Sequence, residues 1–332
     1  MRIVQFHDGN PAQPRVARVG ADGRTLEVLA GNRGTYGFAE QAAMRGRKLA
    51  DLLAQTAVVD RVPYDAVWNE GRLLPPLSHP DPAHLLVTGT GLTHMGSAGA
   101  RDSMHRKIAG DEAQLSDSMK MFRWGVEGGK PADGGPGSQP EWFYKGDGSC
   151  VVAPGAALSM PSFAQDGGEE PEICGLYIVA DDGTPCRIGF ALGNEFSDHV
   201  MERRNYLYLA HSKLRQCSFG PELLLGPLPA HVEGASRVRR GDTVRWEKPF
   251  VSGEANMTHR IAGLEHHHFK YRMFRRPGDL HVHFFGTATL SFVDGVEVAP
   301  GDTFEIEAPA FGRKLVNPLA RLVEDSVAIR EL

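Results

Sequence analysis

Residues 170–179 read Glu-Pro-Glu-Ile-Cys-Gly-Leu-Tyr-Ile-Val, and residues 186–195 read Cys-Arg-Ile-Gly-Phe-Ala-Leu-Gly-Asn-Glu. Between these two apolar runs lies Ala-Asp-Asp-Gly-Thr-Pro, residues 180–185. An Asp-Gly pair between apolar runs is typical of a tight turn joining two antiparallel strands. We therefore predict an antiparallel hairpin that turns about Asp182 and Gly183.

The hairpin predicts a group of three carboxylates. Glu170 and Glu172 are two residues apart, so in a strand they project from the same face. Folding about the turn brings position 172 opposite roughly 194, beside Glu195, and facing side chains in such a ladder lie ~5 Å apart. Carboxylates this close repel unless one is protonated or a cation lies among them, and oxygen ligands favour Mg²⁺ over Mn²⁺ or Ca²⁺. The alternative is that Glu170 is a solvated residue at the strand entry and the other two lie on a polar face.

Composition limits the classes of function. The 332 residues suffice for one large domain plus a small one, or for two medium domains. The chain is 41% hydrophobic and 23% charged, typical of a globular protein. A net charge of -5 and a pI near 6.3 give no electrostatic basis for binding nucleic acid. The short basic clusters at Arg237–Arg240 and Arg272–Arg276 are interpreted as solvated surface.

The N-terminus and the cysteines indicate the compartment. The first residues, Met-Arg-Ile-Val-Gln-Phe-His-Asp-Gly, resemble a strand and lack the apolar segment of a signal peptide. No apolar run approaches the ~18 residues that span a bilayer, so we expect a cytoplasmic protein with no membrane partner. Cys150, Cys174, Cys186 and Cys217 have no zinc-site spacing. Cys174 and Cys186 flank the hairpin and are candidate neighbours, but buried free thiols are favoured over a disulfide.

Turn residues and periodicity divide the chain into a small N-terminal unit, residues 1–80, and a larger region, 81–332. The first unit combines short strands with helical periodicity from Phe38 to Leu53, and the prolines from Pro75 to Pro82 mark a linker. The larger region is rich in short strands and argues for a β-rich α+β fold. Its predicted helices are Ser197–Arg204 and Asn256–Leu264, and its predicted strands are Trp142–Tyr144, Ile173–Val179, Arg187–Leu192, Thr243–Trp246, Leu280–Phe285, Thr287–Phe292 and Thr303–Glu307.

Residues 101–139 form a long irregular segment. Residues 102–124 predict a broken helix, and the glycine-rich run after it predicts a loop. A long irregular segment within a compact domain is often a lid or a binding loop, and a surface insertion without a role is the competing interpretation.

Five stretches together resemble the fumarylacetoacetate hydrolase family. Residues 91–98, Gly-Leu-Thr-His-Met-Gly-Ser-Ala, are similar to its G-L-N-Y-x-x-H-A, and 142–145, Trp-Phe-Tyr-Lys, to its F-F-x-K. Residues 170–179 fit E-x-E-L-x-x-V-I, and 192–197, Leu-Gly-Asn-Glu-Phe-Ser, resemble A-N-D-x-S. Gly286-Thr287 and then Pro300-Gly-Asp302 are similar to G-T-P and P-G-D. Gly312 and Asn317 resemble the closing G-x-x-x-N, although four residues rather than three lie between them.

The resemblance implies a small N-terminal α/β domain, a mixed β-roll catalytic domain and a homodimer. It also implies Mg²⁺ or Mn²⁺ held by three carboxylates, here Glu170, Glu172 and Glu195. The third is Glu where the family usually has Asp, which shifts the ion slightly or alters its coordination. A further departure is Ser97, where hydrolytic members carry the His that activates water, and Thr93 replaces the usual Asn. Serine without a base of its own is a poor general base, so a non-hydrolytic reaction gains support.

Residues 192–221 resemble a sugar-acid branch whose members dehydrate 2-keto-3-deoxy aldonic acids. A metal chelated by the carboxylate and 2-keto oxygen of the substrate acidifies the C3 protons, and the C4 hydroxyl leaves from a metal-bound enolate. A pentonate, the favoured substrate, gives the semialdehyde of 2-oxoglutarate. The alternative is a C–C bond hydrolase of a diketo-deoxy sugar acid or acylpyruvate, with His94 or the lid activating water. A non-catalytic metal-binding or sensor protein is the third hypothesis.

The resemblance assigns roles within this site. Lys213 is the first choice for proton transfer or enolate stabilisation, with a pKa expected to fall beside a cation and an enolate; a salt bridge on an exposed loop is the alternative. Thr287, approached closely through Gly286, binds the substrate carboxylate or is an ordinary strand residue. Lys145 contacts the substrate site and the metal-bound carboxylate, or merely neutralises acidic charge. The remaining expected substrate contacts are Gly91, Thr93, Ser97, Arg101 and Asp102, of which Ser97 is also a catalytic candidate.

Two groups of histidines have simpler interpretations. His266, His267 and His268 are consecutive, cannot all face one ion in regular structure, and are expected at the surface. His281 and His283 share a strand face, and we expect them to be satisfied core residues rather than pocket residues.

Overall fold

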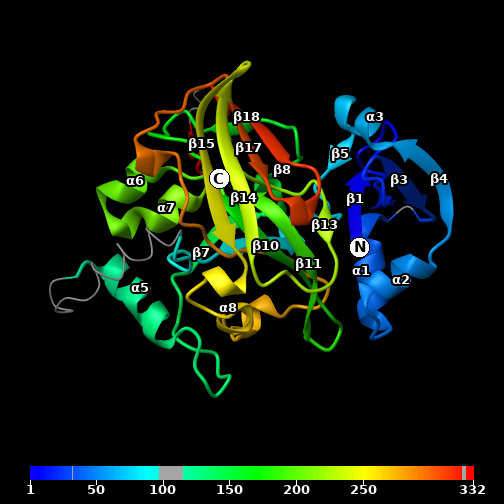
Figure 1. The fold of residues 1–332 in the computed structure, drawn as a ribbon, viewed down its shortest axis with the longest axis horizontal. Coiled ribbons are helices and arrows are strands. Elements are labelled where there is room, and N and C mark those ends of the chain that lie inside the picture. The colour runs from blue at the N-terminus through cyan, green and yellow to red at the C-terminus, as the bar shows by residue number, and fades with distance from the viewer. Residues whose placement is uncertain (32, 97–114, 324–326) are drawn as a thin grey trace.

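A computed structural model describes residues 1–31, 33–96, 115–323 and 327–332. Within them, thirteen strands form one large sheet, and the main path of that sheet runs β4-β3-β2-β1-β13-β11-β10-β16-β6-β7. In Figure 1 this sheet extends from β4 on one side of the molecule to β7 on the other. Its strands are β1 (Arg2–Phe6), β2 (Arg15–Val19), β3 (Thr25–Leu29), β4 (Val58–Pro63), β5 (Leu73–Leu74), β6 (Leu85–Gly89), β7 (Phe143–Asp147), β8 (Val151–Val152), β10 (Pro171–Val179), β11 (Pro185–Asn194), β12 (Cys217–Phe219), β13 (Leu223–Leu224) and β16 (Leu280–Phe284).

A second sheet packs on one face of the large sheet. In the described part of the chain it has five strands in the order β15-β14-β17-β18-β9. A buried apolar cluster joins Ile173, Phe190 and Leu192 of the hairpin to Phe250 and Ile306 of the second sheet. The strands of this sheet are β9 (Leu158–Met160), β14 (Val232–Arg240), β15 (Thr243–Ser252), β17 (Asp302–Glu307) and β18 (Leu315–Arg321).

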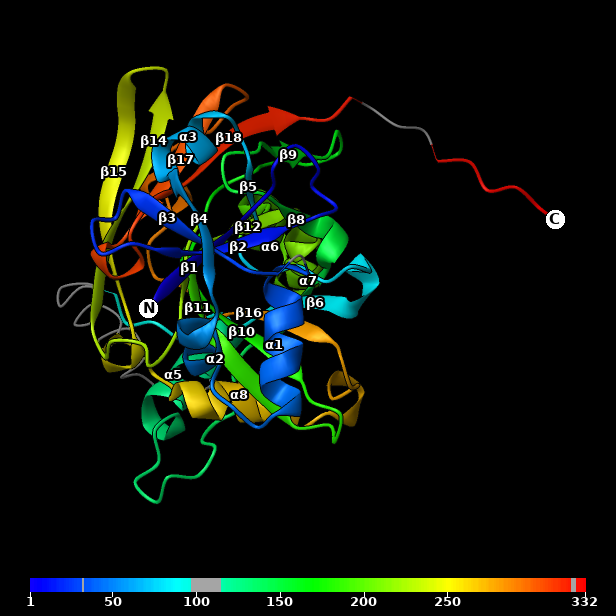
Figure 2. The ribbon, with the colours of Figure 1, turned by 90° about the vertical axis from the view of Figure 1, so that its right-hand side faces the viewer.

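The remaining regular structure in the described residues is helical. Figure 2 looks onto α1 and α2, which lie over the opposite face of the hairpin strands. The predicted helix over 38–53 is instead two helices, because Gly46 adopts the left-handed region with φ +59° and ends the first. The described helices are α1 (Gly34–Met44), α2 (Leu49–Gln55), α3 (Tyr64–Asn69), α5 (Asp117–Gly128), α6 (His199–Arg204), α7 (Leu209–Lys213) and α8 (Ile261–Phe269). None of the described helices is long and apolar enough to cross a membrane.

The N-terminal strands continue the large sheet. Strand β1 pairs with β13, with Ile3 opposite Leu223. One buried cluster also combines Leu29 and Leu53 with Leu176 and Leu280 from the rest of the chain. The division into 1–80 and 81–332 stays a prediction, and the two stretches share a sheet and a core.

The predicted hairpin is β10 and β11. Glu172 faces Gly193, one residue from the position expected, and the register shifts between Leu176 and Tyr177. A bulge of this kind adds a residue to one strand, and no periodicity in the sequence reveals it. Thr287–Phe292, predicted as a strand, contains none in the structure.

Candidate metal and acid–base site

Several strands of the large sheet end at one edge. Cys174 of β10 lies opposite Phe284 of β16, and Phe284 lies beside Gly89 of β6. The start of β10, the end of β11, the end of β16 and the end of β6 therefore lie together. The segments that follow or precede these ends carry the predicted site residues into one place.

Glu170, Glu172 and Glu195 meet at this edge. Each offers a carboxylate oxygen, and the three oxygens lie within 4.8 Å of one another, all on buried residues. The Glu195 backbone N–H donates to the Glu170 carbonyl at 3.1 Å, which continues the hairpin ladder beyond β10 and β11. The structure thus brings together the three carboxylates that the hairpin pattern predicted.

Two lysines and a histidine surround Glu170 and Glu195. Lys213, at the end of α7, donates to Glu170 at 2.5 Å and to Glu195 at 2.7 Å. Lys145 on β7 donates to Glu195, to the Phe196 carbonyl at 2.6 Å and to the Lys213 carbonyl at 3.1 Å. All three ammonium protons of Lys145 therefore have acceptors within the protein.

The positive and negative groups of this network shift one another's pKa values toward the charged forms of Lys213 and Glu170. Burial opposes the charge of Lys213, but Glu170 and Glu195 raise the pKa of Lys213 well above its usual value. We expected a lowered pKa beside a cation and an enolate, and the protein groups alone give the opposite direction. Burial likewise opposes the charge of Glu170, yet Lys213 and His199 lower the pKa of that carboxyl. Lys213 is buried, so it is not on an exposed loop.

His199 was missed by the sequence reasoning. Its imidazole lies 3.0 Å from Glu170 and 3.3 Å from Asp166. Although burial acts against the charged ring, these two carboxylates raise the pKa of His199 to about 10. No local pattern around Asp198 and His199 predicts these contacts, because Asp166 reaches His199 from a separate loop.

Glu172 differs from its neighbours because, among the described residues, it forms no ion pair. Its carboxylate accepts from the Gly286 backbone N–H at 2.6 Å. Burial, and then the negative charges of Glu170 and Glu195, raise the pKa of Glu172 well above its usual value. A buried carboxylate whose charge the protein leaves uncompensated fits a bound divalent cation.

Gly286 and the segment after β6 meet above Glu172. Gly286 has φ +95°, and a Cβ there would lie 2.5 Å from the Thr93 hydroxyl oxygen. The Thr93 hydroxyl donates to the Phe285 carbonyl, so it positions this turn. Thr287 follows and is half-buried. The roles of Thr93, Gly286 and Thr287 toward a substrate stay predictions.

The histidines split between core and surface. His94 is buried, with Nδ1 2.9 Å from the Thr93 hydroxyl and Nε2 2.8 Å from the Ser252 hydroxyl. His267 and His268 are buried in α8, so their predicted exposure was wrong, whereas His266 is exposed. One side of an amphipathic helix faces the core even when consecutive residues are alike.

A second residue missed by the sequence reasoning is Glu141, which precedes β7. It is buried and accepts a hydrogen bond from the Tyr206 hydroxyl at 3.0 Å. Burial raises the pKa of Glu141 to about 7, with Lys213 acting in the opposite direction. Its carboxylate lies against Gly91, where a Cβ would come 1.8 Å from Oε1. The requirement for glycine at position 91 is thus explained by close approach of an acid.

Three predicted contacts cannot be placed. Ser97, Arg101 and Asp102 lie outside the described residues, as does most of the first half of the predicted lid. The described part of that segment contains α5 and packs onto residues 254–260: the Arg260 backbone N–H donates to the Gly129 carbonyl at 3.3 Å.

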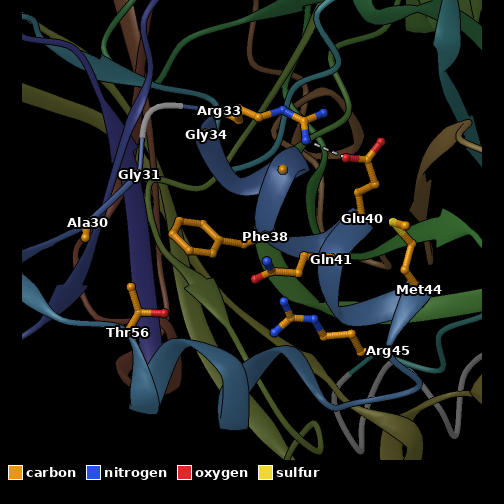
Figure 3. A pocket seen from close by; sticks show the side chains of 11 residues that line it. Ala30, Gly31, Arg33, Gly34, Phe38, Glu40, Gln41, Met44, Arg45 and Thr56 are labelled. Atoms are coloured by element: carbon orange, nitrogen blue, oxygen red, sulfur yellow. Dashed lines mark ion pairs between the residues drawn. The ribbon is translucent and has the colours of Figure 1, made fainter.

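A separate surface pocket of about 580 Å³ lies on the N-terminal part of the chain (Figure 3). Phe38 and Gln41 of α1 line it together with Thr56, and Arg33 pairs with Glu40 at 2.7 Å. The residues that line it include none of the predicted site residues.

The comparisons with known proteins agree with this geometry. No protein-family profile matches the chain. It is 30% identical over 122 residues to a probable 2-keto-3-deoxyxylonate dehydratase of Haloferax volcanii, a match that spans 36% of this chain and 39% of that relative. Among solved structures, 2-keto-3-deoxy-D-arabinonate dehydratase complexed with magnesium and 2,5-dioxopentanoate has a TM-score of 0.69 at 19% identity. That match covers 98% of this chain and 100% of the other.

A 5-carboxymethyl-2-hydroxymuconate delta-isomerase from Mycobacterium smegmatis has a TM-score of 0.58 at 17% identity, covering 97% of this chain and 100% of the other. The isomerase and the dehydratase share one fold with this chain, so the fold alone does not select the reaction. The solved structures show that this chain shares the fold of 2-keto-3-deoxy-D-arabinonate dehydratase. The partial sequence match to a probable 2-keto-3-deoxyxylonate dehydratase agrees with the resemblance to sugar-acid dehydratases that the sequence motifs indicated.

Proposed function

We propose that the protein is a metal-dependent hydro-lyase that dehydrates a 2-keto-3-deoxy sugar acid, a pentonate in the favoured case. The observation that carries the proposal is the buried group of Glu170, Glu172 and Glu195. Glu141, an acid with a pKa near 7, accompanies that group. A cation site next to a group that exchanges protons near neutral pH is what removal of a proton α to a carbonyl requires.

Glu170, Glu172 and Glu195 would hold Mg²⁺, or Mn²⁺, as oxygen ligands. When bound there, the ion supplies the positive charge that makes the C3 protons of a 2-keto acid more acidic and favours the enolate. The ion would also compensate the charge of Glu172, whose carboxylate has no cationic partner among the described residues.

The reaction removes one proton from C3 and the hydroxyl from C4, which together leave as water. For a pentonate, a proton shift from C5 to C3 then gives an enol with a double bond between C4 and C5. Loss of the C5 hydroxyl proton and protonation of C4 convert this enol to the aldehyde, the semialdehyde of 2-oxoglutarate. We assign the proton transfer to Glu141, because a group whose pKa lies near the working pH both accepts and returns a proton readily.

Lys213 then acts as a fixed positive charge and hydrogen-bond donor. Its raised pKa keeps the ammonium protonated in the free protein, which suits stabilisation of the negative enolate oxygen. Lys145 and His199 hold Glu195 and Glu170 in place and are positioning residues.

The remaining assignments concern the substrate. Thr287, with the Gly286 backbone, is proposed to bind the substrate carboxylate, and Gly91 and Thr93 to line the site. Ser97, Arg101 and Asp102 are proposed to contact the distal hydroxyls.

A hydrolytic alternative would need a side chain that activates water. The two ring nitrogens of His94 already contact the Thr93 and Ser252 hydroxyls, and burial lowers the pKa of His94 to about 3. His94 therefore lacks a nitrogen free to take a proton from water. This observation favours dehydration over hydrolysis.

Product identification by mass spectrometry tests the proposal. Purified protein with Mg²⁺ is given a panel of 2-keto-3-deoxy-pentonates and -hexonates. Loss of one water per substrate molecule is expected, and it should cease with EDTA and resume when Mg²⁺ is restored. If diketo analogues are instead cleaved to pyruvate and an acid, the enzyme is a hydrolase and the proposal is wrong.

We also propose a cytoplasmic homodimer with its N-terminal unit at residues 1–80, as the family resemblance implies. Light scattering after size exclusion should give twice the chain mass; a monomer at micromolar concentration would contradict it.

A further inference from the structure

Cys150 and Cys217 lie next to each other behind the metal and acid–base site. Strand β8 begins at Val151, directly after Cys150, and runs parallel to β12 with Cys217 beside Val151. Cys217 belongs to a buried apolar cluster, and Cys150 packs against that same cluster. Two segments far apart in the sequence therefore bring two thiols together.

The backbone spacing permits a covalent bond between them. Cys150 ends a 3-10 turn, Gly148–Cys150, and lies outside β8, so the alternation of side chains along a strand does not turn it away from Cys217. Paired residues in neighbouring strands lie about 4.8 Å apart, and Cys150 is one residue from the partner of Cys217. Because Cys150 lies one residue along the chain from that partner, its Cα atom is roughly 6 Å from the Cα atom of Cys217. A disulfide requires about 4.4–6.8 Å.

The two thiols have the different environments of an attacking and a resolving cysteine. Cys150 is half-buried, whereas Cys217 is buried. The neighbouring Cys217 thiol and then the charge of Lys145 lower the pKa of the Cys150 thiol, although burial opposes them. Burial raises the pKa of the Cys217 thiol well above its usual value. The more acidic, more accessible thiol is the one that reacts first with a peroxide.

The other two cysteines provide an internal comparison. Cys174 and Cys186 were candidate neighbours, but Cys174 faces Ala191 and Cys186 faces Ile178, four residues along the hairpin. Cys186 is half-buried like Cys150, but burial raises the pKa of its thiol. Both thiols are partly exposed, so exposure alone does not single out Cys150, and selectivity for Cys150 over Cys186 tests the environment.

We propose that Cys150 and Cys217 form a reversible disulfide when the protein meets hydrogen peroxide, and that this bond lowers activity through Lys145. The Cys150 thiolate attacks one peroxide oxygen, giving a sulfenic acid and releasing hydroxide, which takes a proton to become water. The Cys217 sulfur then attacks the sulfenic sulfur, the S–O bond breaks, and a second water leaves with the Cys217 proton. Two thiols lose two electrons in total, and one peroxide is reduced to two waters.

Lys145 connects this pair to the carboxylates. It lies on β7, five residues before Cys150, and donates to Glu195 and to the Lys213 carbonyl. Cys217 begins β12, four residues after Lys213. A new bond between the sulfurs pulls the ends of these two segments together, so Lys145, which spans them, must shift relative to Glu195. A shift of about 1 Å in such a site can reduce turnover roughly 100-fold.

The experiment treats the full-length protein with stoichiometric peroxide and counts thiols after denaturation. The count should fall from four to two, with a loss of two hydrogens by mass, and peptide mapping should join the Cys150 and Cys217 peptides. Cys150→Ser should abolish the cross-link, and the matched variant Cys186→Ser should leave it intact. A constant thiol count, or oxidation of Cys186 before Cys150, would overturn the disulfide.

Activity supplies the second measurement, which rests on the proposed dehydration. Oxidised wild-type protein should lose activity at least ~10-fold and regain it with dithiothreitol, while Cys150→Ser should be insensitive to peroxide. A mapped disulfide without loss of activity would contradict the link through Lys145. If no 2-keto acid is turned over even by reduced protein, the proposed function fails, and the thiol count still decides the disulfide.

Discussion

At the residue scale, Glu172 carries the clearest requirement for a cation. Glu170 contacts Lys213 and His199, and Glu195 contacts both lysines. Glu172 instead accepts a backbone N–H, and its pKa is raised by burial and by the two neighbouring carboxylates. In the free protein the ionised form of Glu172 is therefore unfavourable in free energy, and a bound divalent ion would remove that penalty.

Glu172→Gln should weaken Mg²⁺ binding by more than about 100-fold, because even residues that only support a ligand contribute 10–100-fold. The amide oxygen can still accept from the Gly286 N–H, so the apoprotein should unfold at the same temperature or slightly higher. Titration calorimetry and thermal unfolding measure the two effects.

Glu169→Gln is the matched control for this substitution. Glu169 is the adjacent buried carboxylate, and both of its oxygens accept from Ser291. Its loss should lower stability by ~1–3 kcal/mol without a comparable loss of Mg²⁺ affinity. Equal Mg²⁺ affinities for wild type and Glu172→Gln would remove Glu172 from the metal site.

Glu141 governs the predicted pH dependence of the rate. Its pKa is about 7 in the free protein, and a Mg²⁺ ion nearby would lower it by favouring the charged carboxylate. The kcat/KM profile of the Mg²⁺-loaded enzyme should therefore show an ionisation at or below pH 7, with the rate rising as Glu141 loses its proton and becomes the base. Glu141→Gln should lower kcat by roughly 100- to 10,000-fold and remove that ionisation, with Mg²⁺ affinity retained.

Tyr206→Phe tests the same assignment without removing the acid. The Tyr206 hydroxyl donates to Glu141 and lowers the pKa of that carboxyl, so its loss should move the ionisation to higher pH. An unchanged ionisation in both variants would assign it to another group.

At the element scale, local signals predict the hairpin well and its surroundings poorly. The Asp-Gly turn and the apolar runs suffice for β10, β11 and the meeting of their three glutamates. Glu141 could not be found in this way, because its environment arises from Gly91 and Tyr206, which are distant in sequence. The surface exposure predicted for His267 and His268 of α8 was wrong for a related reason. Whether one face of a helix is buried depends on which other elements pack against it.

That packing creates a cluster of uncharged histidines between α8 and β16. The rings of His268 and His283 stack at 4.9 Å, and His268 Nε2 lies 3.0 Å from His281 Nδ1. Burial lowers the pKa of His281 to about 4 and that of His283 to about 3. As pH falls below ~6.5, the unfolded chain binds protons that the folded cluster does not, so stability decreases until about pH 3.

We expect His283→Phe to reduce the stability difference between pH 7.5 and pH 5.0. The reduction should be on the order of 2 kcal/mol, because the phenyl ring cannot bind a proton in either state. Urea unfolding at the two pH values measures it, and the exposed His266→Phe provides the comparison. If both variants keep the wild-type difference, the buried histidines do not cause the acid sensitivity.

At the scale of the whole molecule, the sequence predicted two units, and the structure places strands of both in the same large sheet. The proline cluster and the change in turn residues and periodicity near residue 80 are local features of the sequence. The pairing of β1 with β13 joins residues more than two hundred positions apart, and no local pattern encodes it. The same holds for the core in which Leu29 and Leu53 meet Leu176.

A shared sheet and core predict one cooperative unfolding transition for the whole chain. Leu26 is fully buried in a cluster formed within the N-terminal strands and α3, so Leu26→Ala should cost about 2–5 kcal/mol. Since β1 connects that cluster to β13 and the hairpin, the unfolding of the carboxylate site should shift with it. Calorimetry should show a single peak at a lower temperature, and Mg²⁺ binding should be lost at that same temperature. Two peaks, of which only one responds to Leu26→Ala, would mean that residues 1–80 unfold independently and that the shared sheet does not couple them.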